Sequence, residues 1–298
     1  MDKSPVVDRI MTGAIDAHAH TGPGLFGRVG TSIDIARQAA AYGMRAIVLK
    51  NHQGITSDRA TLVDKVVPDI SVYGGVVLNQ YVGGINPYAV EAAIRLGAKI
   101  VWMPTQWAQQ HIDVYGATEY KHMKQTSSAV KLPVKGISIL DDKGQLTTET
   151  KQVLEIIKQA DVALATSHLS KDEIRLLVRE AREIGIDKII ITHISLSELW
   201  KWSIQEQKEL VENGATLEHV AVYCMENRYL LSPKEVANQI NGVGYRNVMI
   251  ASDCGQLGVP APPEALRLFV GMLLDAGIEE HALHYMLKES PGRLLGLR

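Results

Sequence analysis

Side chains that bind metal ions recur at the ends of short apolar runs in this sequence. The segment IDAHAHTGPG places His18 and His20 one residue apart at the end of such a run, directly before glycine and proline. His168, His193 and Asp253 end three later runs. One histidine at such a place is more often a hydrogen-bonding residue, but five ligands at matching places indicate a metal site. Neutral imidazoles with a carboxylate suit zinc, with manganese, iron, nickel or cobalt as alternatives, so one or two divalent ions are expected.

A repeating unit of strand and helix would position these residues. Eight short β-branched runs are each followed by a longer segment of helical period. The segments between the runs open with Ser, Thr, Asn or Pro and close on Gly, as capped helices do. Because no glycine-rich phosphate loop follows any run, a parallel (β/α)8 barrel of the TIM type is favoured over a doubly wound sheet. The predicted strands span residues 13–20, 44–52, 71–79, 98–105, 162–168, 188–194, 215–223 and 247–253.

The barrel would bring the candidate ligands to one end. Side chains alternate along a strand, so His18 and His20 share one face, with Asp16 one layer below. His168, His193 and Asp253 end the fifth, sixth and eighth predicted strands. Active sites of such barrels lie at the C-terminal ends of the strands. The five ligands are therefore expected to converge.

One interval, residues 106–146, interrupts the repeat after the fourth strand. It carries His111, Tyr115, Tyr120 and His122, and then a predicted hairpin around the turn DDKG. Insertions in such loops lie at the active-site face, so a lid, a substrate wall or a subunit contact is expected, and an ordinary surface excursion is an equal alternative. The whole chain, 1–298, is expected to form a single barrel domain with closing helices at its C-terminus.

The pattern resembles the amidohydrolase superfamily of metal-dependent hydrolases, whose barrels carry HxH on strand 1, His on strands 5 and 6, and Asp on strand 8. The segments GPG, LKNH, WMPT and TSHLS resemble a small uncharacterised group within it. The tail SPGRLLGL resembles the family's closing sequence but departs from it at two places. The resemblance implies that His18, His20 and Asp253 bind a metal, and that His168 and His193 bind the same ion or a second one.

The resemblance also implies a reaction. Asp253 would act as the general base on a metal-activated water and then protonate the leaving group, with His193 near the substrate. The expected reaction is hydrolysis of a C–N or C–O bond in an amide, cyclic amide or lactone of a small polar substrate. Decarboxylation on the same scaffold is the alternative, and a non-catalytic metal-binding barrel is a third hypothesis.

The sequence departs from the family at the end of the fourth strand. Binuclear members carry a bridging carboxylated lysine or a glutamate there, whereas this chain has Trp102 and Thr105 nearby. Either the site holds one ion, or Lys50 or Glu218 supplies the bridge. Lys50 could also bind a substrate carboxylate or serve as a structural cation.

Five residues are expected to contact the substrate. Lys50 and His52 share one parity on the second strand, so both should point into the pocket mouth. Glu218 would reach it from the seventh strand, and Trp102 from the fourth. Arg28, in the loop after the first strand, is a candidate anion clamp, with a solvated loop arginine as the alternative.

Composition limits the classes of partner. The 298 residues include 31 Lys and Arg against 33 Asp and Glu, a formal net charge of −2. The sequence therefore lacks the excess of basic residues that is typical of nucleic-acid-binding proteins. No signal peptide and no long apolar run is present, so a soluble, cytoplasmic protein without a membrane partner is expected. Cys224 and Cys254 form no CxxC pair and are expected to be reduced. A small-molecule substrate is expected, and a homo-oligomer is possible.

Overall fold

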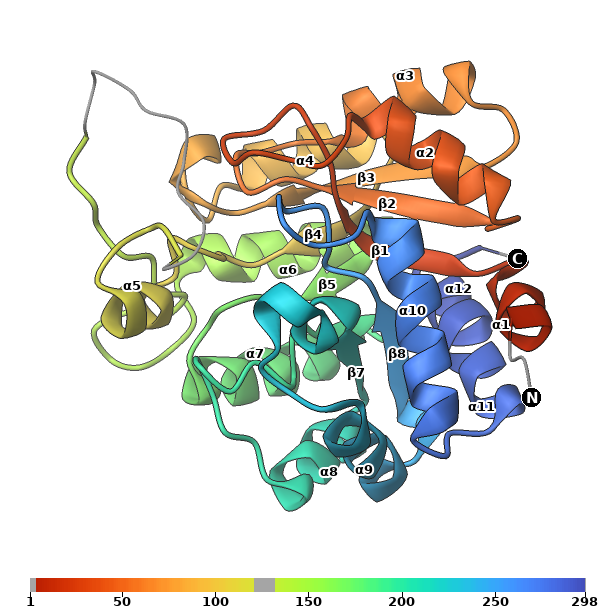
Figure 1. The fold of residues 1–298 in the computed structure, drawn as a ribbon. Coiled ribbons are helices and arrows are strands. Elements are labelled where there is room, and N and C mark those ends of the chain that lie inside the picture. Colours follow the sequence, from red (N-terminus) through yellow and green to blue (C-terminus); the bar gives the residue numbers. More distant parts are fainter. Residues whose placement is uncertain (1–3, 121–131, 298) are drawn as a thin grey trace.

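The computed structural model describes residues 4–120 and 132–297 as a ring of eight parallel strands with helices outside it (Figure 1). Neighbouring strands pair in sequence order and every pair is parallel. Backbone hydrogen bonds from Asp253 to His18 and from His20 to Cys254 join the end of the last strand to the first. The predicted (β/α)8 barrel is confirmed. The strands are β1 (Ile15–His20), β2 (Ala46–Lys50), β3 (Ser71–Val77), β4 (Ala98–Trp102), β5 (Ala163–Ala165), β6 (Ile189–Ile191), β7 (Ala215–Val220) and β8 (Val248–Ala251).

Helices that alternate with the strands cover the barrel. Helices α2, α7, α8 and α9 each begin with a reciprocal capping box of Ser or Thr and an acidic residue three positions later. Gly43 and Gly185, which follow α2 and α7, have φ of 67° and 89°, a conformation that glycine adopts without strain. The repeat helices are α2 (Ser32–Ala41), α3 (Ser57–Val66), α4 (Pro87–Arg95), α6 (Thr148–Ala160), α7 (Lys171–Glu183), α8 (Ile204–Glu212), α9 (Pro233–Val243) and α10 (Pro262–Asp275).

Four further α-helices in the described part of the chain lie outside the repeat. Helix α1 (Ser4–Met11) precedes the barrel, and α11 (Glu280–His284) and α12 (Ser290–Leu294) close the chain. Helix α5 (Gln109–Tyr115) lies in the insertion after β4, where the sequence indicated no helix. The predicted hairpin is present, since an antiparallel bridge joins Leu140 to Leu146. His122 lies outside the described residues.

Two candidate site residues, and the residue before a third, stand on unusual backbone just beyond their strands. Strands β5 and β6 are three residues long and end earlier than predicted. Ser167, which precedes His168, has a φ of 52°, and His193 and Asp253 have φ of 56° and 48°. Residues other than glycine rarely adopt this left-handed region, and those that do concentrate at functional sites. The chain therefore bends sharply at the candidate metal ligands after β5, β6 and β8.

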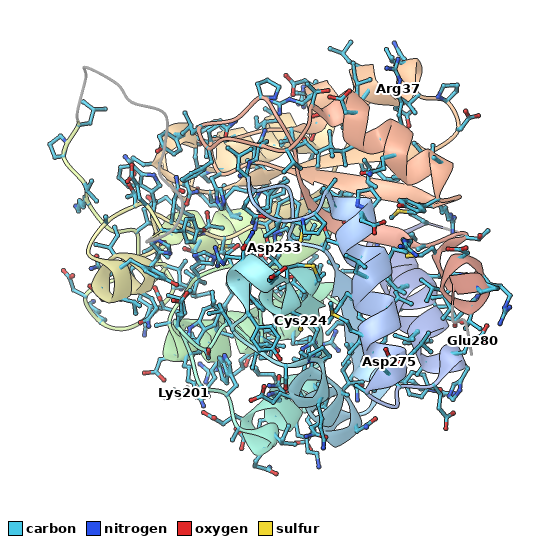
Figure 2. The ribbon with its side chains drawn as sticks, in the orientation of Figure 1. Arg37, Lys201, Cys224, Asp253, Asp275 and Glu280 are labelled. Carbon is cyan, nitrogen blue, oxygen red and sulfur yellow. The ribbon has the colours of Figure 1, made fainter. Side chains whose placement is uncertain are left out.

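The hydrophobic core fills both the barrel and the layer between strands and helices. Val48, Val101, Leu164 and Met249 are fully buried, and Figure 2 shows side chains packed between the ribbons. Both cysteines are free and buried. Within the described ranges, no helix combines the length and apolar character needed to cross a bilayer.

Candidate metal centre

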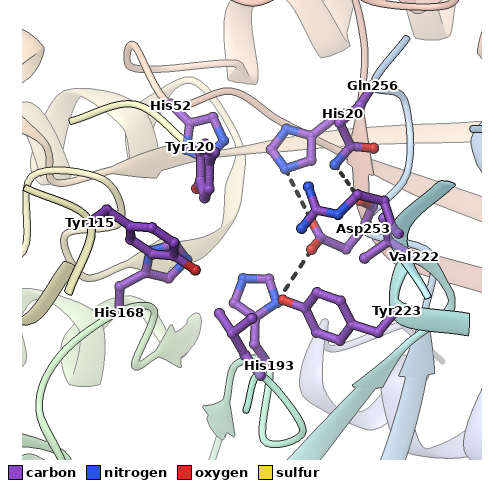
Figure 3. Close-up of a pocket in the computed structure, with 12 residues that line it drawn as sticks. His20, His52, Tyr115, Tyr120, His168, His193, Val222, Tyr223, Asp253 and Gln256 are labelled. Atoms are coloured by element: carbon purple, nitrogen blue, oxygen red, sulfur yellow. Dashed lines mark hydrogen bonds and ion pairs between the residues drawn. The ribbon is translucent and has the colours of Figure 1, made fainter. Parts of the chain in front are cut away.

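A pocket lies at the C-terminal ends of the strands (Figure 3). In Figure 3, Asp253 lies between His20 and His193, and close polar contacts connect its carboxylate to both rings. The lining residues are His20, His52, Tyr115, Tyr120, His168, His193, Leu196, Val222, Tyr223, Arg228, Asp253 and Gln256.

Asp253 is the carboxylate at the centre of the cluster. Its Oδ1 is 3.0 Å from Nε2 of His18 and 3.0 Å from Nε2 of His20, and its Oδ2 is 3.4 Å from Nδ1 of His193. Burial raises the pKa of Asp253, but His18 and His193 outweigh burial and hold that pKa well below its ordinary value. Asp253 is therefore an ionised carboxylate in contact with three imidazoles.

His18 lies between Asp253 and a second buried carboxylate, Glu218. Nδ1 of His18 is 3.1 Å from Oε1 of Glu218, and Nζ of Lys50 is 2.8 Å from Nε2 of His18. Burial and Lys50 lower the pKa of His18, yet the two carboxylates raise it to about 9. The field at this position therefore favours a positive charge.

The other three candidate ligands are neutral imidazoles. Burial lowers the pKa of His193 to about 3 and places the pKa values of His20 and His168 well below the ordinary value. Arg28, whose Nη2 is 3.2 Å from Nδ1 of His20, lowers the pKa of His20 further. Neutral imidazole is the form that binds metal ions.

The cluster fits a divalent metal ion. The atoms of two groups lie within 4.8 Å of one another, His18 with His20 and Asp253, and His18 with His193 and Glu218. Imidazole and carboxylate lone pairs come this close only when a proton or a cation lies between them. Nδ1 of His193 is buried and has no hydrogen-bond partner in the described part of the chain. This donor set is the nitrogen and oxygen set of transition metal sites.

His168 belongs to neither group. It lines the pocket beside His193, with ring centroids 5.2 Å apart. The end of β4 brings neither a carboxylate nor a lysine, because Trp102 ends the strand and the Thr105 hydroxyl pairs with Nδ1 of His52 at 3.0 Å. Glu218 and Lys50 approach the cluster instead, both at His18.

Of the five residues expected to contact the substrate, His52 lines this pocket, and the other four lie beside or beneath it. Lys50 and Glu218 are buried against His18, and Trp102 lies near Lys50, whose Nζ is 5.4 Å from the ring centroid. Arg28 reaches the edge of His20 instead. Strand parity correctly predicted that Lys50 and Glu218 point into the barrel. Their side chains contact His18, one of the candidate metal ligands, and do not reach the pocket above it.

Sequence reasoning missed two polar pocket residues on the loop after β7, Tyr223 and Arg228. No motif marks either residue. Only their position in a loop after a strand could have indicated them, because every loop that follows a strand of this barrel faces the site.

Comparisons with known proteins agree with the architecture. Residues 13–218 match a family model described as a family of unknown function, DUF6282. No curated protein sequence matches the chain.

Solved structures of hydrolases share the fold over almost the whole chain. An amidohydrolase from Pseudomonas aeruginosa has a TM-score of 0.61 at 13% identity, covering 99% of this chain and 98% of that one. A probable 2-pyrone-4,6-dicarboxylic acid hydrolase from Acinetobacter baumannii, solved with citric acid bound, has a TM-score of 0.60 at 12% identity, covering 95% and 99%. The organophosphorus hydrolase from Deinococcus radiodurans has a TM-score of 0.61 at 13% identity, covering 96% and 93%. At such identities the likeness shows a common fold.

Proposed function

Because the chain belongs to DUF6282, a family of unknown function, we propose its activity from the site itself: a metal-dependent hydrolase of amidohydrolase type. It would cleave a C–N or C–O bond, as in an amide, a cyclic amide or a lactone, in a small polar substrate. The observation that carries the proposal is the ionised Asp253 in contact with His18, His20 and His193 at the mouths of β1, β6 and β8.

His18, His20 and Asp253 would hold the ion, with zinc the first candidate and manganese, iron, nickel or cobalt the alternatives. When bound there, a divalent ion supplies Lewis acidity, which polarises the substrate and makes a water molecule more acidic. His193 and Glu218 could contribute to a second position that shares His18.

Asp253 is the base in this proposal. Its Oδ2 lies on the side of His193, away from the shared contact of Oδ1 with His18 and His20. An ionised carboxylate oxygen there can take a proton from water and return it to the leaving group. Neutral His193 lines the pocket and would orient the substrate. The hydrolases that share the fold support this reaction class.

The charges around the pocket favour an anionic substrate. Before any metal is added, Arg28, Lys50 and Arg228 carry three positive charges and protonated His18 a fourth. Asp253 and Glu218 carry two negative charges, so the net charge is +2. Arg228 lines the pocket and has no ion pair with any residue that the structure describes. A guanidinium without a carboxylate partner can bind a substrate carboxylate. The citric acid bound in the Acinetobacter hydrolase supports this choice.

A substrate panel tests the proposed function. Protein reconstituted with zinc, manganese or cobalt would be assayed against lactones, cyclic amides and linear amides, each as a free carboxylate and as its methyl ester. Mass spectrometry distinguishes hydrolysis, which adds water, from decarboxylation, which removes carbon dioxide. We expect hydrolysis that stops on chelation and returns with the metal. Loss of carbon dioxide as the main reaction, or turnover that chelation does not change, would contradict the proposal.

We expect Arg228→Met to weaken binding of carboxylate substrates selectively. A hydrogen bond to a charged group contributes roughly 1.5–3 kcal/mol, so KM should rise by about 10-fold or more while kcat changes little. The methyl ester of the same substrate should be unaffected. Arg179→Met on the outer surface of α7, where the side chain is 60% exposed, is the matched control. An equal rise in KM for acid and ester would exclude carboxylate binding by Arg228.

A further inference from the structure

A tyrosine on the loop after β7 points its hydroxyl into the pocket. Tyr223 is buried and lines the pocket, and its ring centroid is 6.1 Å from that of His193. In Figure 3 the side chain of Tyr223 extends from the pocket wall toward His193, with the hydroxyl at its inner end. The hydroxyl therefore faces the space that a substrate would occupy.

Backbone contacts fix the position of Tyr223, which lies in a short 3₁₀ helix directly after β7. The N–H of Val222 donates to the carbonyl of Ser252 at 3.1 Å, which ties this helix to the end of β8. The carbonyl of Tyr223 accepts from the N–H groups of Leu230 at 2.9 Å and Leu231 at 3.2 Å. The backbone that carries the phenol ring is thus held in place before a substrate arrives.

The tyrosines of the pocket differ in what their hydroxyls contact. Tyr115 lines the same pocket, but its hydroxyl donates to Glu198 at 2.8 Å. The hydroxyl of Tyr223 makes no hydrogen bond to any residue within the ranges 4–120 and 132–297. A hydroxyl removed from bulk water without a partner costs free energy, which a ligand that accepts its hydrogen bond restores. The open donor of Tyr223 therefore indicates a contact with a ligand.

Tyr223 lies on the side of Asp253 where the proposed reaction takes place. Oδ2 of Asp253, the proposed base, is 3.4 Å from Nδ1 of His193, and the ring of Tyr223 lies beside that of His193. Water that gives its proton to Oδ2 forms its new bond to a substrate carbonyl carbon nearby. The π electrons of that carbonyl then move onto its oxygen, which gains negative charge. A phenol hydroxyl keeps its proton near neutral pH and can donate a hydrogen bond to this oxygen.

We propose that Tyr223 is a further catalytic residue, whose hydroxyl donates a hydrogen bond to the substrate oxygen that gains charge in the reaction. A donor aimed at such an oxygen stabilises the transition state more than the bound substrate, so it raises kcat more than it lowers KM. Arg228, which would bind the substrate carboxylate, acts mainly on KM. The catalytic effect rests on the proposed function, whereas the contact of Tyr223 with an oxyanion can be measured without turnover.

Tyr223→Phe removes the hydroxyl and keeps the ring. We expect kcat on the best substrate of the panel to fall by about 100-fold with little change in KM, because loss of one such donor typically costs about 100- to 1,000-fold in kcat. Tyr229→Phe makes the same change on the same loop, at a residue that is 60% exposed, and should change neither constant. A rise in KM with an unchanged kcat would place the hydroxyl away from the reacting carbon and would overturn the proposal.

Phosphonoacetate tests the contact without turnover. Its tetrahedral phosphonate resembles the charged oxygen that forms in the reaction, and its carboxylate can reach Arg228. Isothermal titration calorimetry would compare the zinc-reconstituted wild type with Tyr223→Phe and Tyr229→Phe. We expect Tyr223→Phe to bind about 10-fold more weakly or worse, as loss of a hydrogen bond to a charged group implies, and Tyr229→Phe to match the wild type. Equal affinities in all three proteins, or no binding by the wild type, would overturn the proposal.

The results separate this inference from the proposed function. Hydrolysis with an unchanged kcat in Tyr223→Phe overturns the inference and leaves the hydrolase standing. Weaker phosphonoacetate binding by Tyr223→Phe, in a protein that hydrolyses no member of the panel, supports the oxyanion contact and contradicts the hydrolase.

A crystal structure of the wild-type complex decides if thermal unfolding shows that Tyr223→Phe does not fold. The proposal predicts that Oη of Tyr223 lies roughly 2.7–3.1 Å from a phosphonate oxygen. A phosphonate bound in the pocket without this contact would contradict it.

Discussion

Asp253→Asn should abolish turnover, with an expected fall in kcat/KM of at least about 1,000-fold. The amide matches the carboxylate in shape but carries no charge and cannot take a proton from water. Asp253 also contacts His18, His20 and His193, so the substitution removes the charge that draws these three side chains together. The measurement is steady-state kinetics on the best substrate of the panel, with circular dichroism to show that the barrel is retained.

Asp172→Asn is the matched control for that substitution. It makes the same chemical change on α7, where the side chain is 93% exposed, and it should leave kcat/KM unchanged. A folded Asp253→Asn protein with more than about a tenth of wild-type activity would move the base to another residue, because loss of general base catalysis costs at least about 100-fold.

His18→Asn should abolish metal binding and also weaken the metal-free fold. His18 is common to both candidate ligand groups, so metal affinity should fall by more than about 100-fold, beyond the loss expected for an orienting residue. The substitution also leaves the buried carboxylates of Asp253 and Glu218 without the imidazole between them. Removing one partner of a buried ion pair costs about 3–5 kcal/mol, which should appear as a lower free energy of unfolding.

Elemental analysis and urea unfolding of the metal-free protein measure the two effects separately. His281→Asn, on a side chain that is 61% exposed, should change neither quantity. If His18→Asn keeps wild-type metal content, the ligand set proposed here is wrong. If it loses metal but keeps full stability, Lys50 alone neutralises the two carboxylates.

The barrel itself could be predicted because its signals are local. Strands such as Ile15–His20 alternate with helices whose caps are visible in the sequence, as at Ser170 and Glu173 of α7. Helix α5 escaped prediction because it is seven residues long and its N-cap residue, Ala108, makes no side-chain hydrogen bond. Its stability comes from contacts with Ile137 and Glu198, which lie far from it in sequence.

The candidate site was predictable only in part. Spacing and strand order indicated the side chains that meet at Asp253, because the C-terminal ends of parallel strands lie at one end of a barrel. Periodicity could not show that His193 and Asp253 stand in left-handed turns beyond their strands. Strand parity predicted that Lys50 and Glu218 point into the barrel, but it could not predict how far below the pocket they lie. That depth depends on the contacts that both side chains make with His18.

Two residues that tertiary packing brings to the site left no pattern in the sequence. His111 was noted only as one polar residue of a long insertion, and its contact with His168 depends on how that insertion folds back. Arg228 lies in a loop with no motif and is distinguished by its place on the pocket wall. Both are consequences of tertiary packing, which single-sequence spacing does not encode.

X-ray diffraction from crystals of the zinc-reconstituted protein, recorded at the zinc absorption edge, tests the metal centre most directly. The proposed centre predicts an anomalous peak from a zinc ion bound by Nε2 of His18, Nε2 of His20 and a carboxylate oxygen of Asp253. Each of the two histidine nitrogens already lies 3.0 Å from Oδ1 of Asp253. A fully reconstituted crystal with no peak at these atoms, or with its zinc bound only at other residues, would contradict the metal centre and the hydrolase proposed from it.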